Sequence, residues 1–198
     1  MKKRDLYLAV CLFLLAWAPL TPETARAQLV YDDPVFEWKD NRDPEAPRPS
    51  PNAFVGLQIG STRVMIAYGS PGVKGREIFG SLLPYGVLWR AGANEATTIT
   101  FTGDVLIEGH DVPAGTYSLF TIPDEQEWTI IFNKENNQWG AFSYKEKEDV
   151  LRITAPSQEA TFQENLAFGF EQVDPDGFSA SVVLNWEKTR VVFKVEEP

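Results

Sequence analysis

The chain has 198 residues, a formal net charge of −10, one histidine and one cysteine. This composition excludes an intrachain disulfide, a zinc site of several cysteines and a histidine-rich metal site. The acidic balance argues against nucleic acid and anionic membrane surfaces as partners, because both require a basic footprint. The length and a hydrophobic share of 43% fit a single globular domain.

The first 27 residues have the pattern of a secretory signal peptide. A basic stretch over residues 2–4 precedes an apolar run over residues 6–15, and small residues follow at Ala25 and Ala27. The run is too short for a membrane span. We therefore expect cleavage after Ala27, export to the periplasm, the cell surface or the medium, and no transmembrane segment in the mature chain. A lipoprotein signal using Cys11 and an uncleaved anchor are the two alternatives.

Residues 28–51 read as an acidic linker. Its five prolines each remove a backbone donor and prevent regular elements, and they stand at Pro34, Pro44, Pro47, Pro49 and Pro51. A short apolar cluster, Val35, Phe36 and Trp38, interrupts the acidic sequence. This cluster either docks on the domain or belongs to a mobile tail.

From Asn52 to the C-terminus the apolar residues alternate with a period of two. Such runs, rich in β-branched and aromatic residues and separated by Gly, Pro and Asp, predict half-buried strands. The clearest runs cover residues 63–68, 98–102, 117–122, 128–133, 178–187 and 190–196, and a further strand is expected from Gln138 to Tyr144. The strand pattern predicts an all-β domain over residues 52–198, an antiparallel β-sandwich or partly closed barrel with at most one short helix.

Two features refine this prediction. The only helical candidate is Arg76–Leu83, which Pro84 would end. The predicted strands that contain Phe120, Ile122 and Ile131 are apolar on both faces, which indicates central strands that are covered on both sides.

A glycine-rich basic loop over residues 69–76 follows one predicted strand. Its backbone amides are suited to cradling an anion. It lacks the spacing of a phosphate loop, and the simpler interpretation is a wide turn in which Arg76 pairs with a carboxylate.

The segment Trp89–Glu95 is the most unusual in composition. Arg90 could hold a ligand carboxylate, with Asn94 and Glu95 binding hydroxyls. In the structural interpretation, Arg90 and Glu95 pair with each other, Asn94 closes a turn and Trp89 belongs to the core.

A second candidate group lies further along the chain. Asn133 ends one predicted strand, and Trp139, Tyr144 and Asp149 follow. The two aromatic rings could stack on a sugar face or an organic cation, although we expect one of them to pack in the core. His110 is placed in a hairpin turn.

These segments together resemble a bacterial family of exported proteins, the domain-of-unknown-function family number 2911. The matching residues are Ser50-Pro51, Tyr68, Ser70-Pro71, Lys74-Gly75-Arg76, Ile78-Phe79-Gly80, Pro84-Tyr85-Gly86, Trp89-Arg90, Gly92-Ala93-Asn94-Glu95, residues 114–120, Trp128 to Lys134, Trp139-Gly140, Tyr144 and Asp149. The resemblance covers about three-quarters of the chain. It implies one shared, exported scaffold and no particular activity.

The sequence carries no nucleophile motif and no metal-ligand spacing, so catalytic residues are not assigned and no cofactor or metal is expected. We expect a non-catalytic ligand-binding or structural module of the cell envelope, whose partner is a small molecule, a glycan or an envelope protein. Two alternatives are an envelope enzyme that uses carboxylates such as Glu95 or Asp149, and an assembly subunit that pairs through a sheet edge. The candidate ligand-binding residues are Arg76, Trp89, Arg90, Asn94, Glu95, Asn133, Trp139, Tyr144 and Asp149.

Overall fold

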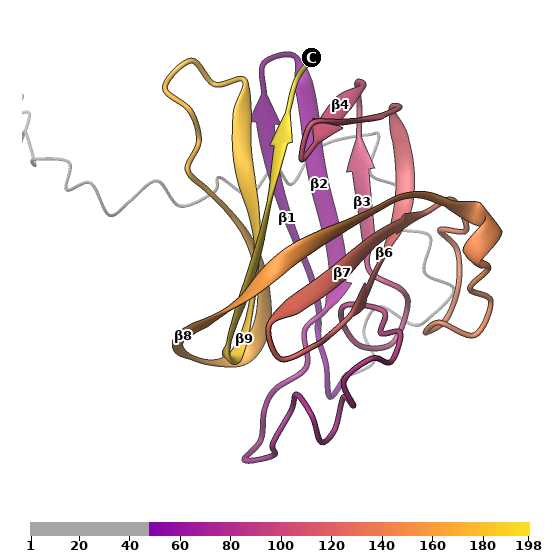
Figure 1. Ribbon diagram of the computed structural model, residues 1–198, viewed down its shortest axis with the longest axis vertical. Coiled ribbons are helices and arrows are strands. Elements are labelled where there is room, and N and C mark those ends of the chain that lie inside the picture. Colours follow the sequence, from indigo (N-terminus) through magenta and orange to yellow (C-terminus); the bar gives the residue numbers. More distant parts are fainter. Residues whose placement is uncertain (1–47) are drawn as a thin grey trace, which may run out of the picture.

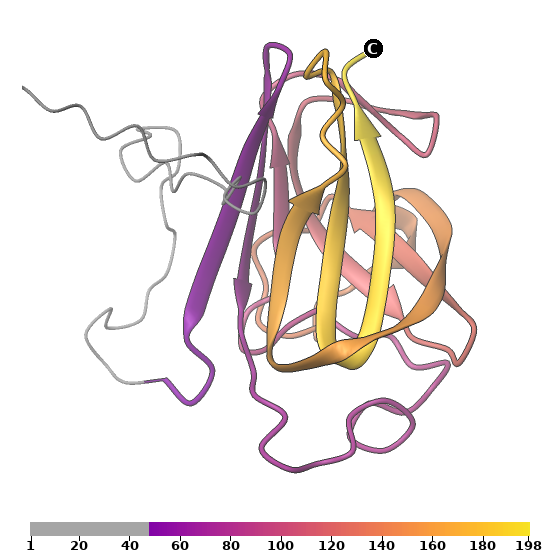
Figure 2. The same cartoon turned by 90° about the vertical axis from the view of Figure 1, so that its left-hand side faces the viewer.

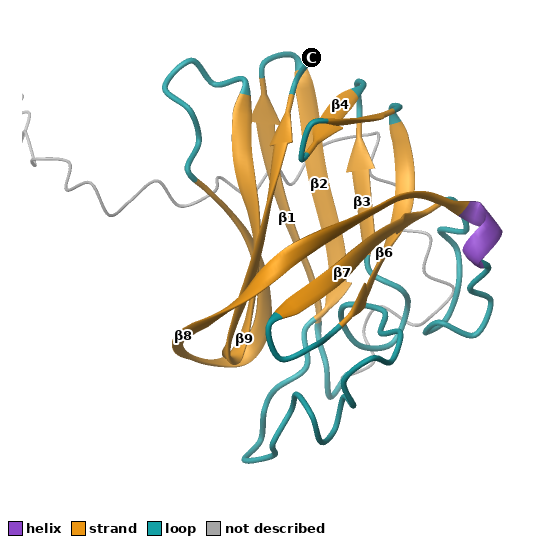
Figure 3. Ribbon diagram, viewed as in Figure 1, coloured by secondary structure: helices purple, strands orange, loops and turns teal. Residues whose placement is uncertain are grey.

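The computed structural model describes residues 48–198. The predicted signal peptide and most of the predicted linker, including Val35, Phe36 and Trp38, lie outside the described residues. Within them the domain is all-β, as the alternating pattern predicts, and one short 3₁₀ helix, η1 (Glu146–Glu148), is its sole helical element (Figure 3). The strands are β1 (Asn52–Ile59), β2 (Thr62–Gly69), β3 (Thr98–Phe101), β4 (Val105–Ile107), β5 (His110–Val112), β6 (Gly115–Ile122), β7 (Glu127–Asn133), β8 (Asp149–Glu171) and β9 (Ser179–Glu196).

All nine strands belong to a single antiparallel sheet in the order β1-β2-β3-β6-β7-β8-β9-β4-β5. The sheet curls around its own core, and β8 is the element that turns the corner (Figure 1). Its first part pairs with β7 and its last part with β9, with shifts of register between Glu159 and Ala167. The sheet stays open between β1 and β8, so the architecture is the partly closed barrel of the sequence prediction.

Strand β9 reverses direction within its own length (Figure 2). Glu187 adopts a positive φ of 57° at the reversal. As a result, the backbone N–H of Glu197 donates to the carbonyl oxygen of Phe178 at 2.9 Å, which places the two ends of β9 side by side. The two alternating runs predicted from the sequence, residues 178–187 and 190–196, correspond to the two arms of this element.

The main core lies inside the curled sheet and is centred on aromatic rings. Trp89 stacks on Trp186 with ring centroids 5.8 Å apart, and Phe79 contacts Trp128 at 4.9 Å. Core packing of this kind is the main source of stability for the described domain, because it removes large apolar surfaces from water.

A second, smaller cluster lies on the outer face of the sheet. Phe120 of β6 and Ile131 of β7 are fully buried there beside the buried Ala96, and Leu88, Ile122, Ala141 and Tyr144 pack against them. This confirms the prediction that β6 and β7 are covered on both faces.

Three local predictions are wrong. Residues 76–83 form turns and no helix, because the amides of Leu82 and Leu83 bond five residues back to Glu77 and Ile78. Residues 139–144 form successive turns after a single bridge, since Gly140 has a positive φ of 61°. His110 begins β5, one residue after a turn formed by Glu108 and Gly109, which both have positive φ.

Candidate functional site

The strand next to β6 is interrupted, and the interruption creates the first candidate loop. Trp89 exchanges two backbone hydrogen bonds with Thr121 of β6, and the carbonyl of Thr97 accepts one from Leu119. Residues 90–96, called here the Arg90 loop, leave the sheet between these two points. The amide of Thr97 closes the loop by donating to the carbonyl of Arg90 at 3.3 Å.

The glycines around this loop allow a close approach of backbones. A methyl group added to Gly69 would lie 2.2 Å from the carbonyl oxygen of Ala93. The amide of Ala93 in turn donates to the carbonyl of Gly69 at 3.2 Å. The position of the Arg90 loop therefore depends on a residue without a side chain at position 69.

Trp89 is a core residue, as the structural interpretation predicted. Its ring lies in the aromatic centre of the core, and its indole N–H donates to the carbonyl of Gly92 at 3.0 Å. That bond connects the Arg90 loop to the core, so Trp89 supports the position of the loop.

Arg90 differs from the other candidates because its charge is not matched. Its guanidinium is half-buried and makes no hydrogen bond or ion pair with any residue from 48 to 198, and its Nε atom is fully buried. Desolvation alone lowers the pKa of the Arg90 guanidinium, with no carboxylate opposing it. The expected pair between Arg90 and Glu95 is not formed.

Asn94 and Glu95 instead hold the chain that enters β1. Asn94 closes a turn with a positive φ of 66°, and its side-chain amide donates to the carbonyl of Ser50 at 3.1 Å. The carboxylate of Glu95 accepts a hydrogen bond of 3.3 Å from Arg48.

The second candidate loop, residues 134–148, covers the outer face of β6 and β7 and is called here the Trp139 loop. It is joined to the Arg90 loop by two backbone hydrogen bonds, from Ala96 to Gln138 and from Gly140 to Asn94. Trp139 is 52% exposed and Phe142 is 88% exposed on this loop. The Arg90 loop and the Trp139 loop are thus joined through their backbones; the first carries Arg90, and the second carries the rings of Trp139 and Phe142.

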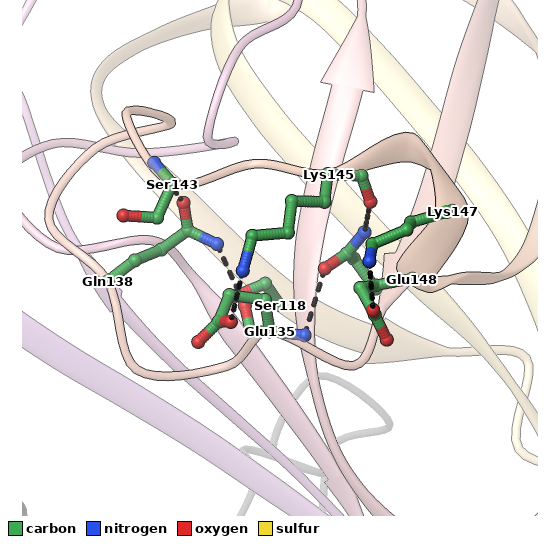
Figure 4. Close-up of polar contacts among 8 residues, drawn as sticks. Ser118, Glu135, Gln138, Ser143, Lys145, Lys147 and Glu148 are labelled. Carbon is green, nitrogen blue, oxygen red and sulfur yellow. Dashed lines mark hydrogen bonds and ion pairs between the residues drawn. The ribbon is translucent and has the colours of Figure 1, made fainter.

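Buried polar side chains fasten the Trp139 loop to the sheet. The hydroxyl of Ser118 donates to the carbonyl of Glu135, and the amide of Asn133 donates to the carbonyl of Lys145, at 2.8 and 2.9 Å. Figure 4 shows Ser118, Glu135 and Lys145 together with Gln138, whose side-chain oxygen accepts a hydrogen bond from the amide of Ser143. The side chain of Asn133 is therefore fully hydrogen-bonded within the protein, since its amide group donates to Lys145 and Asp149 and its oxygen accepts from Glu135.

Tyr144, Asp149 and Arg152 form a compact polar network beside this fastening. Asp149 accepts hydrogen bonds from Asn133, Tyr144 and Arg152 at 2.6, 2.8 and 2.7 Å. The ring of Tyr144 packs on Phe120 with centroids 5.1 Å apart, which confirms that one of the two predicted aromatics packs in a core. Burial and the neighbouring Asp149 raise the pKa of Tyr144 to about 12.

Arg76 lies apart from these two loops and is used by its own turn. Its guanidinium donates to the carbonyls of Gly72 and Val73 at 2.7 and 3.0 Å. In the same segment the backbone amide of Lys74 donates to the carboxylate of Glu164 at 2.9 Å, so a side chain of β8 takes the donor that an anion would use.

The structure thus brings together two groups of candidates. Arg90, Asn94, Glu95 and Trp139 lie on the joined loops, and Asn133, Tyr144 and Asp149 form the fastening below them. Sequence reasoning missed the parts played by Arg48, Gln138 and Arg152. Arg152 carries the one recognisable signal, a guanidinium three residues after Asp149.

The described residues hold no group of three or more histidine, cysteine, aspartate or glutamate side chains placed to bind a metal ion. No helix in the same part of the chain is long and apolar enough to cross a membrane.

Comparison with known proteins identifies the family and adds no activity. A family model described as "Protein of unknown function (DUF2911)" matches residues 50–195, which includes both candidate loops, strands β1 to β8 and all of β9 except its last residue. No curated protein and no solved structure matches the chain. Since the match spans well over half of the sequence, the chain belongs to the DUF2911 family.

Proposed function

We propose that this domain is a non-catalytic ligand-binding module of an exported protein, and that Arg90 holds an anionic group of the ligand. The observation that carries the proposal is the half-buried Arg90 guanidinium with no ion pair or hydrogen bond in the described part of the chain. A partly desolvated charge without a partner is costly. An anionic ligand that makes charge-assisted hydrogen bonds to the guanidinium would offset this cost.

Comparison with other arginines supports this assignment. Arg48, Arg152 and Arg190 each bond a carboxylate, from Glu95, Asp149 and Glu171 at 3.3, 2.7 and 2.6 Å. In a chain with a net charge of −10, carboxylates are plentiful. Leaving Arg90 unpaired in such a chain is consistent with a site kept for an external anion.

The surroundings favour a carboxylate-bearing sugar, as found in acidic glycans. The Trp139 loop, hydrogen-bonded to the Arg90 loop, presents a half-exposed indole at Trp139. A guanidinium on one loop and an indole on the loop bonded to it match a ligand that combines an anionic group with an apolar ring face.

The carboxylates that an enzyme would need are engaged in structural contacts. Asp149 accepts three hydrogen bonds, and Glu95 is paired with Arg48. A general base needs a free lone pair within reach of the proton that it removes. These contacts support a binding role over acid–base catalysis.

Calorimetric titration with sodium glucuronate, and with glucose as its neutral counterpart, tests the proposal. We expect saturable binding of glucuronate only, a loss of about tenfold or more in affinity for Arg90→Gln, and partial recovery for Arg90→Lys, since one charge-assisted bond contributes about 1.5–3 kcal/mol. Arg76→Gln is the matched control, because it removes a guanidinium that binds its own turn. Equal binding by wild type and Arg90→Gln, or no binding by wild type, contradicts the proposal.

A further inference from the structure

The opening between β1 and β8 has the features of a site for an added strand. Strand β1 is first in the sheet order, and among strands β1 to β9 it pairs with β2 alone. On the other side of the opening, β8 contacts the end of β2 and the chain after it: the amide of Phe168 donates to the hydroxyl of Tyr68 in β2, and the amide of Leu166 donates to the carbonyl of Pro71. Neither strand bonds to the other among the described residues.

The core is incompletely covered along this opening. Ala53, Val55 and Leu57 of β1 and Phe170 of β8 point to the core and pack against it, but all four are only partly buried. Their equivalents in β2, Val64 and Ile66, are fully buried. Apolar side chains that face a core and stay half-exposed indicate that a further element can cover them.

The backbone of β1 presents hydrogen-bonding groups towards the opening. The amide of Ser70 donates to the carbonyl of Pro51, so odd-numbered residues of β1 bond towards β2. In an antiparallel pair the intervening residues direct their N–H and C=O groups away from the partner. Asn52, Gly56 and Gln58 are three of these residues.

The two edges of the sheet are also protected very differently. The β5 edge is three residues long, contains Asp111 and is followed by Pro113. β1 is eight residues long and contains no charged residue and no proline. Short, charged or proline-flanked edges resist strand addition, whereas a long uncharged edge invites it.

We propose that this opening takes an extended apolar segment as an added strand, and that the occupant is residues 35–38 of the same chain. These residues, Val35-Phe36-Glu37-Trp38, lie outside the described residues. Paired with β1, they place the rings of Phe36 and Trp38 on one face and Glu37 on the other. The first face then covers the half-buried core residues, and Glu37 faces water.

The length of the connection permits this arrangement. Fourteen positions along the chain separate Trp38 from Asn52, where β1 begins. An extended connection of this length spans up to about 45 Å, and an eight-residue strand is about 27 Å long. Residues 35–38 can therefore reach any point of the β1 edge while the linker prolines fill the connection.

Amide exchange measured by NMR on the mature full chain tests the proposal. We expect the amides of Asn52, Gly56 and Gln58 to be protected in the wild type and to exchange about tenfold faster or more in the double variant Phe36→Asp and Trp38→Asp, because the added strand would no longer be apolar. Phe142→Asp is the matched control, since it removes an exposed ring elsewhere. Unchanged amides of Val182 and Ile66 would show that the fold is intact.

Two outcomes overturn the proposal. Equal exchange of the β1 amides in wild type and double variant would show that residues 35–38 do not cover the edge. Protection that rises with protein concentration, together with a dimer in solution, would show that a second copy is the occupant. Neither outcome bears on the role of Arg90, so the two proposals fail independently.

Discussion

The hydroxyl of Tyr144 donates a hydrogen bond of 2.8 Å to the carboxylate of Asp149, which joins the end of the Trp139 loop to the start of β8. The same hydroxyl accepts a bond of 2.6 Å from Arg152. The ring of Tyr144 meanwhile covers Phe120 on the outer face of β6. One side chain therefore combines an apolar and a polar attachment of the Trp139 loop.

Replacing Tyr144 by phenylalanine separates these two attachments. The ring contact with Phe120 is kept, but Asp149 loses a donor and Arg152 loses an acceptor. We expect the free energy of unfolding, measured by urea denaturation, to fall by about 1–2 kcal/mol. Tyr85→Phe is the control, because Tyr85 makes no hydrogen bond with any residue of the described chain. Equal effects of the two variants would contradict the role assigned to the Tyr144 hydroxyl.

The alkaline limit of stability should depend on the same hydroxyl. Burial and Asp149 raise the pKa of Tyr144 from 10.0 to about 12. A group whose pKa is raised on folding stabilises the fold fully below its unfolded pKa, and this contribution is lost as the pH rises from about 10 to about 12. Tyr144→Phe should lack this component of the pH dependence, measured as unfolding free energy across that window. A wild type and variant that lose stability in parallel would contradict the prediction.

The C-terminal end of the domain has an acid-sensitive contact. Glu197 accepts hydrogen bonds from the backbone amide and the hydroxyl of Ser61 in the β1–β2 turn, which lower the pKa of its carboxyl group. The contact should therefore be complete above the ordinary carboxyl pKa and be lost as the pH falls through the lowered value. We expect the Ser61 amide, followed by NMR, to lose protection at acidic pH in the wild type and to show no such step in Glu197→Gln. A step of equal size in both proteins would assign it to another group.

The Arg90 loop should be sensitive to a single methyl group at position 69. Gly69→Ala places a Cβ atom 2.2 Å from the carbonyl oxygen of Ala93, so either the loop or β2 must move. We expect a loss of about 1–3 kcal/mol in the free energy of unfolding, together with weaker glucuronate binding. Gly169→Ala is the matched control, because no atom lies within 4 Å of its added Cβ. If Gly169→Ala were the more damaging change, the close approach at Gly69 would not position the loop.

Much of the fold follows from alternation of apolar residues. The predicted runs at residues 63–68 and 128–133 lie within β2 and β7. Strands β6 and β7, which the sequence shows to be apolar on both faces at Phe120 and Ile131, are covered on both faces. Strand β8 was not recognised, because residues 157–165 are mostly polar and exposed where it turns the corner. The sequence pattern predicts a strand over residues 138–144, where the structure has turns. Hydrophobic spacing carries no information about the positive φ of Gly140, which ends the extended backbone there.

The candidate site was harder to predict than the fold. Composition singled out Arg90, Asn94 and Glu95 as neighbours, but chain proximity did not make Arg90 and Glu95 partners. Arg48 takes the carboxylate of Glu95 from a position 47 residues away. Ion pairing between distant positions depends on how the loops cross, which sequence spacing does not encode.

The most direct test of the binding proposal observes the Arg90 side chain itself. Nε–H of Arg90 is buried and unbonded, so its ¹H–¹⁵N resonance reports whether an anion reaches the guanidinium. We predict that titration with sodium glucuronate shifts this resonance to saturation, at the same midpoint as the calorimetric titration, and that glucose and sodium chloride leave it unmoved. A resonance that stays fixed while glucuronate binds, or that follows sodium chloride equally, would contradict the assignment of Arg90 as the anion-binding residue.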